Sequence, residues 1–206
     1  MSISDNRSRP AVLGREEVLA EFRAAGALLE GHFILSSGLH SPNYLRCARV
    51  LMDARRATRL CEALAQCVRA VVQTPFELVA SPAMGGVIVG HEMGRQFSVP
   101  AIFFERVDGK LALRRGFSVA RDAKVLLVED IVTTGLSSRE CIDGIEAEGG
   151  EVIAAACLID RSGGKADLGV PLASLACLEI PLYPADGLPP ELSRIPAAKP
   201  GSRGLR

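Results

Sequence analysis

The sequence predicts an α/β protein in which helices cover both faces of a parallel β-sheet. Short, almost wholly apolar segments such as residues 124–128 and 152–159 are typical of strands that are buried on both faces. Segments with helical periodicity, such as residues 137–148, alternate with them, which is the pattern of a parallel sheet. The chain has 206 residues, of which 48% are hydrophobic, and this is enough for one domain with a sizeable core.

Two helices are expected in the N-terminal third. Residues 15–25 and 53–72 both repeat apolar side chains every three or four positions, and Asp53 is placed to cap the second helix. The segment between them, residues 31–46, is interrupted by glycine and proline and is predicted to be irregular.

From residue 76 onward the chain alternates between strands and helices. Strands are expected at residues 76–80, 100–104, 124–128 and 152–159, and helices from the turn at 81–86 to about residue 96 and over 137–148. Glu129 and Asp130 are expected to end the third strand. Two glycines, Gly149 and Gly150, are expected to close the second helix.

One segment breaks this alternation. Residues 106–116 lie where a helix would be expected, and they contain an Asp-Gly turn and four basic residues. Two interpretations remain open: a solvated β-hairpin, or a mobile cationic flap that closes over an active site.

Charge and hydropathy narrow the range of functions. The chain has 24 basic and 24 acidic residues, so no overall positive field draws it to nucleic acid or to a membrane, and neither is an expected partner. Its longest strongly apolar segment is too short to span a membrane, and the first ten residues lack an apolar signal core, so a cytoplasmic protein is expected. The six cysteines contain no C-x-x-C pair and are expected to be reduced and buried.

The most informative segment is V-L-L-V-E-D-I-V-T-T-G-L-S-S, residues 125–138. An apolar strand delivers two carboxylates, and a short loop of small and hydroxylated residues leads into a helix. Ligands of open α/β sheets bind at the carboxyl ends of strands, and the N–H groups at a helix N-terminus bind phosphate. Carboxylates suit the vicinal hydroxyls of a sugar, so this segment indicates a site for a phosphorylated sugar.

The same segment also has a purely structural interpretation, in which its hydroxyls only cap the helix. Known nucleotide-binding loops do not decide between the two. Gly109-Lys110 and Gly164-Lys165 lack the Ser or Thr of a P-loop, and the chain contains no G-x-G-x-x-G segment.

Residues 128–137 closely resemble the phosphoribosyl pyrophosphate (PRPP) signature of type I phosphoribosyltransferases. Three further segments resemble the orotate phosphoribosyltransferase family: G-H-F-I-L-S-S-G-L-H-S-P-N-Y at 31–44, S-P-A-M-G-G at 81–86 and L-I-D-R-S-G-G at 158–164. The resemblance covers residues 17–201. It implies a type I phosphoribosyltransferase fold and the transfer of ribose 5-phosphate from PRPP to orotate, which gives orotidine 5′-phosphate and diphosphate in UMP biosynthesis.

The resemblance also implies an organisation for the chain. Residues 1–48 would form a small N-terminal hood that contributes to the base site, residues 49–196 the core, and residues 197–206 a disordered tail. The basic segment at 106–116 would be a flexible β-hairpin loop. Family members use Mg²⁺, held chiefly by the diphosphate with no direct protein ligand expected, and form homodimers in which the loop covers the partner's site.

Roles for individual residues follow from the same resemblance. Glu129 and Asp130 match the acidic pair that holds the ribose hydroxyls of PRPP, and Arg161 matches a residue that contacts orotate, as does Thr133. The PRPP loop around the 5-phosphate corresponds to Ile131, Val132, Thr133, Thr134, Gly135, Leu136 and Ser137. The expected catalytic residues are Lys110, Arg106 and Asp130.

The chain departs from the family pattern in three places. Ser36 and Met84-Gly85 stand where many members have a lysine, and residues 106–116 contain no histidine. The arginines of that segment are therefore candidates to supply the missing positive charge. His32 and His40 are expected to be structural, although a place for His40 in the base pocket stays open.

Two other classes of PRPP-binding protein share part of this pattern. Purine phosphoribosyltransferases of the same fold place a carboxylate at the position of Thr133, which has none. A PRPP-sensing regulator that binds nucleic acid would need a helix-turn-helix domain or a basic face. The N-terminal extension is too short for a helix-turn-helix domain, and the zero net charge argues against a basic face.

Overall fold

The computed structural model describes residues 13–35 and 37–200, and its main element is a six-stranded sheet in the order β5-β4-β3-β6-β7-β8. The parallel strands are β3 (Leu78–Pro82), β4 (Ala101–Val107), β6 (Lys124–Val132), β7 (Glu151–Asp160) and β8 (Leu172–Cys177). At one edge β5 (Lys110–Leu113) runs antiparallel to β4. The expected parallel sheet is confirmed, and β8 is a strand that the sequence patterns did not indicate.

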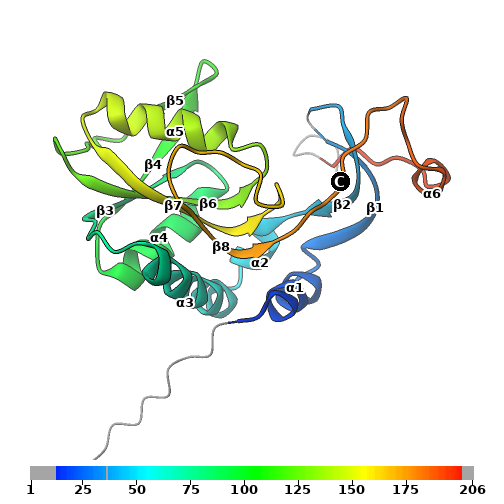
Figure 1. Cartoon of the computed structure of the whole chain (residues 1–206), viewed down its shortest axis with the longest axis horizontal. Coiled ribbons are helices and arrows are strands. Elements are labelled where there is room, and N and C mark those ends of the chain that lie inside the picture. The colour runs from blue at the N-terminus through cyan, green and yellow to red at the C-terminus, as the bar shows by residue number, and fades with distance from the viewer. Residues whose placement is uncertain (1–12, 36, 201–206) are drawn as a thin grey trace, which may run out of the picture.

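Helices cover both faces of this sheet (Figure 1). The helices of the described residues are α1 (Arg15–Ala24), α2 (Cys47–Leu51), α3 (Ala54–Val71), α4 (Gly86–Phe97), α5 (Leu136–Ala147) and α6 (Pro190–Ser193). Of these, α5 packs on one face of the sheet and α3 and α4 pack on the other. Side chains of β6 alternate between the two layers of the core. Val125 and Leu127 pack under α5, whereas Leu126 and Val128 pack under α3 and α4. Both faces of the strand are thus buried, which explains its unbroken apolar run.

The strongest helix predictions are confirmed. Asp53 caps α3, because its Oδ1 accepts hydrogen bonds from the backbone N–H groups of Arg55 and Arg56, at 3.0 and 3.2 Å. The helix expected at 15–25 is α1, and the one expected at 137–148 is α5.

The segment expected to be irregular instead forms a second, two-stranded sheet. β1 (Leu28–Ile34) pairs antiparallel with β2 (His40–Leu45). Glycine and proline are tolerated here for local reasons. Gly31, at a φ of 153°, lies at the irregularity between Glu30 and Phe33. Pro42 lies between the paired residues Ser41 and Asn43 and has no partner in the register of β1 and β2, so its missing N–H is harmless.

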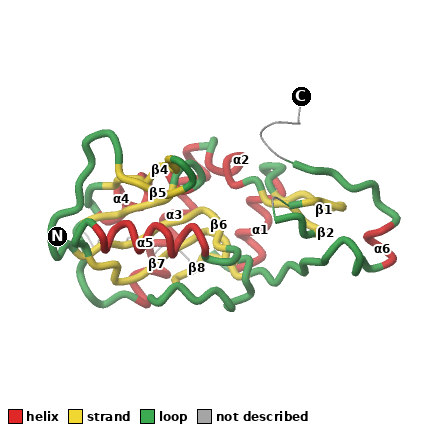
Figure 2. Tube along the Cα trace, turned by 90° about the horizontal axis from the view of Figure 1, so that it is seen from above, coloured by secondary structure: helices red, strands yellow, loops and turns green. Residues whose placement is uncertain are grey.

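The C-terminal part of the chain returns to this small sheet. Ala198 donates its N–H to the His32 carbonyl and accepts from the Ile34 N–H, both at 2.8 Å, while Tyr183 and His40 exchange two backbone hydrogen bonds. We call this unit, made of β1, β2, α6 and residues 183–198, the hood; it stands at one end of the molecule (Figures 1 and 2). Residue 198, expected in a disordered tail, is therefore paired, because its backbone completes the hood. Residues 201–206 and Ser36 lie outside the described residues.

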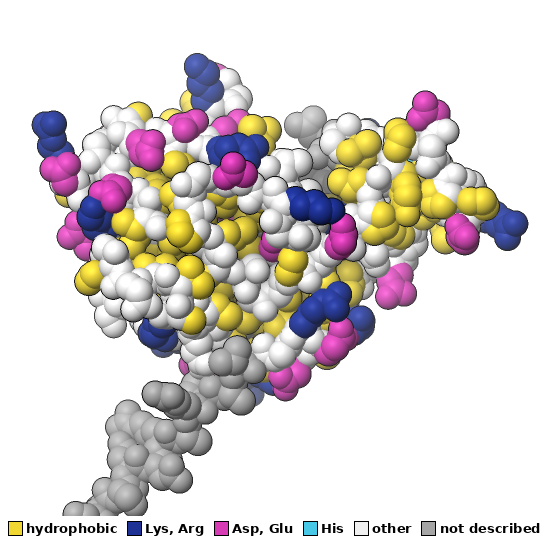
Figure 3. Space-filling view, in the orientation of Figure 1, with side chains coloured by type: hydrophobic (Ala, Val, Ile, Leu, Met, Phe, Trp, Pro, Cys, Tyr) yellow, Lys and Arg dark blue, Asp and Glu magenta, His cyan; other side chains and the backbone are white. Residues whose placement is uncertain are grey.

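The thiols are largely in the core, as expected. Cys47, Cys61, Cys141 and Cys157 are buried and Cys67 is half-buried, whereas Cys177 is exposed. No disulfide joins cysteines of the described residues. On the face seen in Figure 3, acidic and basic side chains are interspersed, as the balanced composition implies.

Candidate active site

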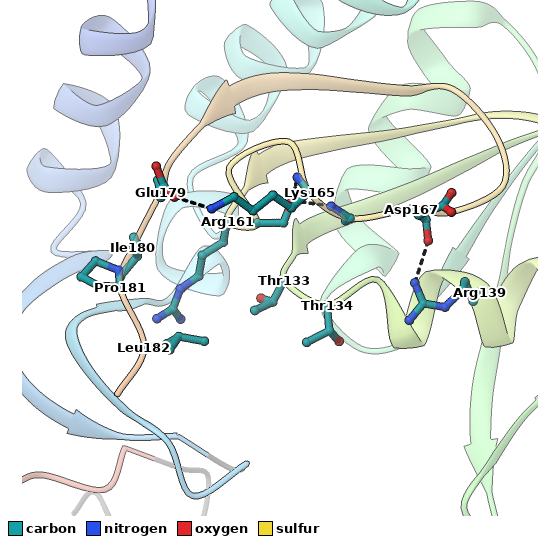
Figure 4. A pocket seen from close by; sticks show the side chains of 12 residues that line it. Thr133, Thr134, Arg139, Arg161, Lys165, Asp167, Glu179, Ile180, Pro181 and Leu182 are labelled. Atoms are coloured by element: carbon teal, nitrogen blue, oxygen red, sulfur yellow. Dashed lines mark hydrogen bonds and ion pairs between the residues drawn. The ribbon is translucent and has the colours of Figure 1, made fainter. Parts of the chain in front are cut away.

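A cavity of about 700 Å³ lies where β6, β7 and β8 end. The loops that follow these three strands line it: Thr133 and Thr134 come after β6, Arg161 after β7, and residues 180–182 after β8 (Figure 4). Ligands of open α/β sheets bind at this edge, and the volume suits a small molecule. The structure thus brings together three residues that the sequence analysis placed in the site.

Arg161 is the buried cation of this cavity, and it has no countercharge. Its side chain is only 9% exposed, and burial lowers the pKa of its guanidinium. Nη2 donates to the Ser41 hydroxyl on β2 at 2.7 Å, whereas Nε has no partner within residues 13–35 and 37–200. No carboxylate in that part of the chain forms an ion pair with it. A buried cation without a countercharge favours an anionic ligand.

The other cations of the cavity are already engaged (Figure 4). The Lys165 ammonium lies 2.5 Å from a carboxylate oxygen of Glu179, and Arg139 donates from Nη1 to the Asp167 carbonyl at 2.7 Å. Sequence patterns did not single out Arg139, Lys165 or Ser41. Each lies among other polar residues in its segment, and only the fold brings Arg139 and Lys165 to the cavity and Ser41 to Arg161.

The loop after β6 turns sharply into α5. Gly135 has a φ of 74°, and a Cβ built on it would lie 2.5 Å from a methyl group of Leu168. Glycine is therefore required at this turn for both conformation and space. Thr134 and Ser137 are exposed around it, and Thr134 Oγ1 lies 3.4 Å from the Leu136 N–H.

The acidic pair does not lie side by side. β6 continues to Val132, which pairs with Asp160, so the expectation that the carboxylates end the strand is wrong. Because the strand continues, successive side chains leave opposite faces of the sheet. Glu129 is buried on the α5 side. Asp130 is half-buried on the other, where its Oδ1 accepts from the Ile131 N–H at 2.9 Å.

Gly85 faces Asp130 closely. A Cβ at Gly85 would lie 2.6 Å from Asp130 Oδ1 and 2.8 Å from its carboxyl carbon. A lysine, which many family members have here, would fit only if Asp130 moved. The departure from the family pattern at this position is thus matched to the placement of the carboxylate.

Burial raises the pKa of Glu129 to about 8, with Asp130 adding to the rise and the nearby Ser138 hydroxyl offsetting part of it. Between pH 4.5 and 8 the unfolded chain has lost a proton that the folded chain keeps, so the free energy of unfolding falls as the pH rises through this window. We expect Glu129→Gln to remove this slope, which reaches about 1.4 kcal/mol per pH unit.

Urea unfolding at pH 5, 6, 7 and 8 measures this slope directly. The matched control is Glu148→Gln, at an exposed glutamate of α5's C-terminal end, which should keep the wild-type slope. Equal slopes in wild type and Glu129→Gln would show that Glu129 ionises like an exposed carboxyl.

The basic segment is a hairpin of β4 and β5 with a two-residue turn. Asp108 and Gly109 have φ values of 48° and 86°, as a type I′ turn requires. Lys110 is exposed beside the turn. Arg106 donates to the Gly109 carbonyl and to Glu140 on α5, both at 2.5 Å. Neither Lys110 nor Arg106 lines the cavity, so the structure does not bring them together with Arg161.

Two further observations concern the ligands that the site could hold. The described residues contain no group of three or more His, Cys, Asp or Glu side chains that could hold a metal ion. His32 Nε2 lies 2.6 Å from His40 Nδ1, both rings are buried in the hood, and neither lines the cavity.

Among the described residues, no helix has the length and apolar character to cross a membrane.

The mostly parallel sheet, the loop after β6 and the cavity beside it define a phosphoribosyltransferase domain, and the model of the phosphoribosyl transferase domain family matches residues 51–168. The chain is 60% identical to the orotate phosphoribosyltransferase of Maricaulis maris, over 93% of this chain and 98% of that one. It is 62% identical to that of Rhizorhabdus wittichii, over 91% and 96%. The chain belongs to the orotate phosphoribosyltransferase family.

Solved structures of orotate phosphoribosyltransferases have the same fold. The orotate phosphoribosyltransferase of Aeropyrum pernix superposes with a TM-score of 0.61 at 26% identity, covering 79% of this chain and 94% of that chain. That of Mycobacterium tuberculosis H37Rv in complex with inorganic phosphate has a TM-score of 0.63 at 22% identity, covering 80% and 95%, a likeness of fold alone.

Proposed function

We propose that the cavity after β6, β7 and β8 is the base side of an active site that uses PRPP and orotate. The chain is an orotate phosphoribosyltransferase, an enzyme of pyrimidine biosynthesis that forms orotidine 5′-phosphate and diphosphate. The observation that carries the assignment of the cavity is Arg161, a buried guanidinium without a countercharge. Orotate is a planar anion, and a guanidinium fork suits its carboxylate and carbonyl oxygens.

The substrates would then occupy neighbouring parts of the strand ends. Orotate lies between Arg161 and Thr133, and the 5-phosphate of PRPP lies in the loop of residues 131–137 at the start of α5. Asp130, half-buried at the end of the sheet, is the acid placed to hold ribose hydroxyls. Glu129 could join it only by leaving its buried position under α5.

The reaction needs positioning and electrostatics more than acid–base chemistry. A ring nitrogen of orotate gives up its proton to water or diphosphate and forms a bond to C1 of PRPP, while the bond from C1 to the diphosphate oxygen breaks. Positive charge develops on the sugar and negative charge on the leaving diphosphate. Lys110 and Arg106 are proposed to neutralise the diphosphate when the hairpin closes, which also excludes water. Closure requires Arg106 to leave Glu140.

Mg²⁺ also belongs to this proposal. The described residues offer no cluster of three acidic or imidazole ligands, which fits an ion that takes most of its ligands from the substrate diphosphate. When bound, Mg²⁺ supplies further neutralisation of the diphosphate charge.

The family resemblance also supports a homodimer that works in the cytoplasm, with the hairpin of one subunit over the site of the other. The balanced charge gives no reason to expect nucleic acid or a membrane as a partner.

A substrate panel tests the assignment. The pure protein is mixed with PRPP and Mg²⁺ and offered orotate, uracil, hypoxanthine or adenine separately. We expect consumption of orotate alone. Consumption of a purine without orotate would instead support the alternative in which the fold serves purine salvage.

Arg161→Ala is expected to raise the KM for orotate about ten- to a hundredfold, the loss that follows from removing a charge-assisted hydrogen bond. The KM for PRPP should change little, because Arg161 lies after β7 and not in the loop after β6. Steady-state kinetics with each substrate varied in turn measures both. Arg121→Ala, at an exposed arginine before β6, is the control. A larger effect on PRPP than on orotate would contradict the role in binding the base.

A further inference from the structure

Asp160, the last residue of β7, is a buried carboxylate that does not line the cavity. Its Oδ1 accepts from the Ser162 N–H at 2.8 Å and from the Ser162 hydroxyl at 2.6 Å. Its Oδ2 accepts from the Gly164 N–H at 2.9 Å and from the Cys177 thiol at 3.7 Å. A carboxylate offers about four acceptor sites, so these donors leave none for a substrate or a metal ion.

The hydrogen-bond network continues through Ser162. While its hydroxyl donates to Asp160, the oxygen accepts from the backbone N–H groups of Lys165 and Ala166, at 3.0 and 2.9 Å. Gly163 and Gly164, with φ values of 69° and 82°, supply the turn inside the network. One carboxylate thus shapes the whole loop of residues 161–166, and four residues of this loop line the cavity.

The peptide group that joins Asp160 to Arg161 is held from both sides by the neighbouring strands. Its N–H donates to the Val132 carbonyl at the end of β6, and the Asp160 carbonyl accepts from the Leu178 N–H after β8, both at 2.7 Å. The Asp160 side chain then sets the direction of the chain immediately after Arg161. From this position the guanidinium reaches the hood and contacts Ser41 (Figure 4 shows its approach past Thr133).

We infer that Asp160 is a positioning residue for base recognition, whose carboxylate shapes the loop so that Arg161 meets the orotate anion. The inference rests on the proposed function of the cavity. Sites that bind small anions depend on supporting hydrogen bonds that hold the contacting side chain in place. The filled acceptor sites of Asp160 separate this role from direct contact with substrate.

Asp160→Asn tests the inference with little change in shape. The amide keeps one oxygen, but its NH₂ group faces the donors of Gly164 and Cys177. We expect the KM for orotate to rise about ten- to a hundredfold, as the loss of hydrogen bonds to a charged group implies, with the KM for PRPP within about threefold of wild type. A role in stability alone would lower the melting temperature and leave the ratio of the two KM values unchanged.

Two further variants keep the test decisive if Asp160→Asn does not fold. Ser162→Ala removes the hydroxyl relay and should raise the KM for orotate alone, whereas Ser162→Thr keeps a hydroxyl and should restore it. The matched control is Asp53→Asn, because Asp53 also accepts two backbone N–H groups but caps α3 and does not line the cavity.

The outcomes are distinguishable. If wild type consumes orotate and folded Asp160→Asn leaves both KM values unchanged, or raises the KM for PRPP as much as that for orotate, the positioning role is overturned and the proposed function stands. If wild type consumes no orotate, the proposed function fails first.

Discussion

Lys110→Ala is expected to lower kcat about 100- to 1,000-fold while the affinity for PRPP stays nearly unchanged. In the structure Lys110 is exposed beside the turn of the β4–β5 hairpin and lies outside the cavity. A cation that reaches the diphosphate only when the hairpin closes stabilises the transition state more than the bound substrate, and its loss appears mainly in kcat.

The measurement combines steady-state kinetics with calorimetric titration of PRPP. Lys124→Ala is the control, because Lys124 begins β6 at the end of the sheet opposite to the site and pairs with Glu151. A loss of PRPP affinity that matches the loss of kcat would show that Lys110 binds the ground state.

At an orotate concentration well below the raised KM of Arg161→Ala, mixing Lys110→Ala with Arg161→Ala is expected to restore about a quarter of wild-type activity. If Lys110 acts across the dimer interface while Arg161 acts within its own subunit, a heterodimer of Lys110→Ala and Arg161→Ala contains one intact site and one site that lacks both groups. Random pairing of equal amounts places about half of the dimers in the hetero form, and half of their sites are intact, as follows for a two-fold symmetric dimer.

Subunits are exchanged by mild denaturation and refolding, and native mass spectrometry on differently tagged chains verifies the heterodimer. The control is each variant refolded alone and assayed at the same low orotate concentration, where each should keep only a few per cent of wild-type activity. Parental activity in a verified heterodimer would mean that the hairpin serves its own subunit. The experiment therefore also tests whether the protein is a dimer at all.

The state of the hairpin connects these predictions. Arg106 is tied to Glu140 on α5, and α5 begins at the proposed phosphate loop. Both partners of this ion pair are partly exposed, so the pair is weak and a diphosphate can compete for Arg106. In the proposed closure, Arg106 would exchange Glu140 for the diphosphate as its anionic partner.

Local patterns were sufficient wherever a segment's structure depends on its own residues. The helix after Asp53, the buried strands β6 and β7 and the hairpin turn at Asp108-Gly109 each follow from spacing, capping or turn chemistry. The loop after β6 could also be recognised, because a strand, two acids and a glycine before a helix form one continuous segment. The substrates, PRPP and orotate, were predicted from the family resemblance and not from this local pattern.

Other features depend on contacts between distant segments, which local patterns do not encode. β1 and β2 form a sheet because they pair with each other and with residue 198, and Gly31 and Pro42 are tolerated in that context. The continuation of β6 beyond Asp130 depends on pairing with β7. That pairing sends Glu129 and Asp130 to opposite faces, although the sequence places them side by side.

Short runs of residues with their own physical preferences were therefore sufficient to predict the fold class, the loop after β6 and the family. Only the tertiary structure decided which side chains share the cavity. Arg161 meets Ser41, 120 positions away, and Asp160 shapes the loop through hydrogen bonds to Ser162 and Gly164. Hydrogen bonds of this kind depend on distances of a few ångströms between folded segments, and residue types alone do not specify those distances.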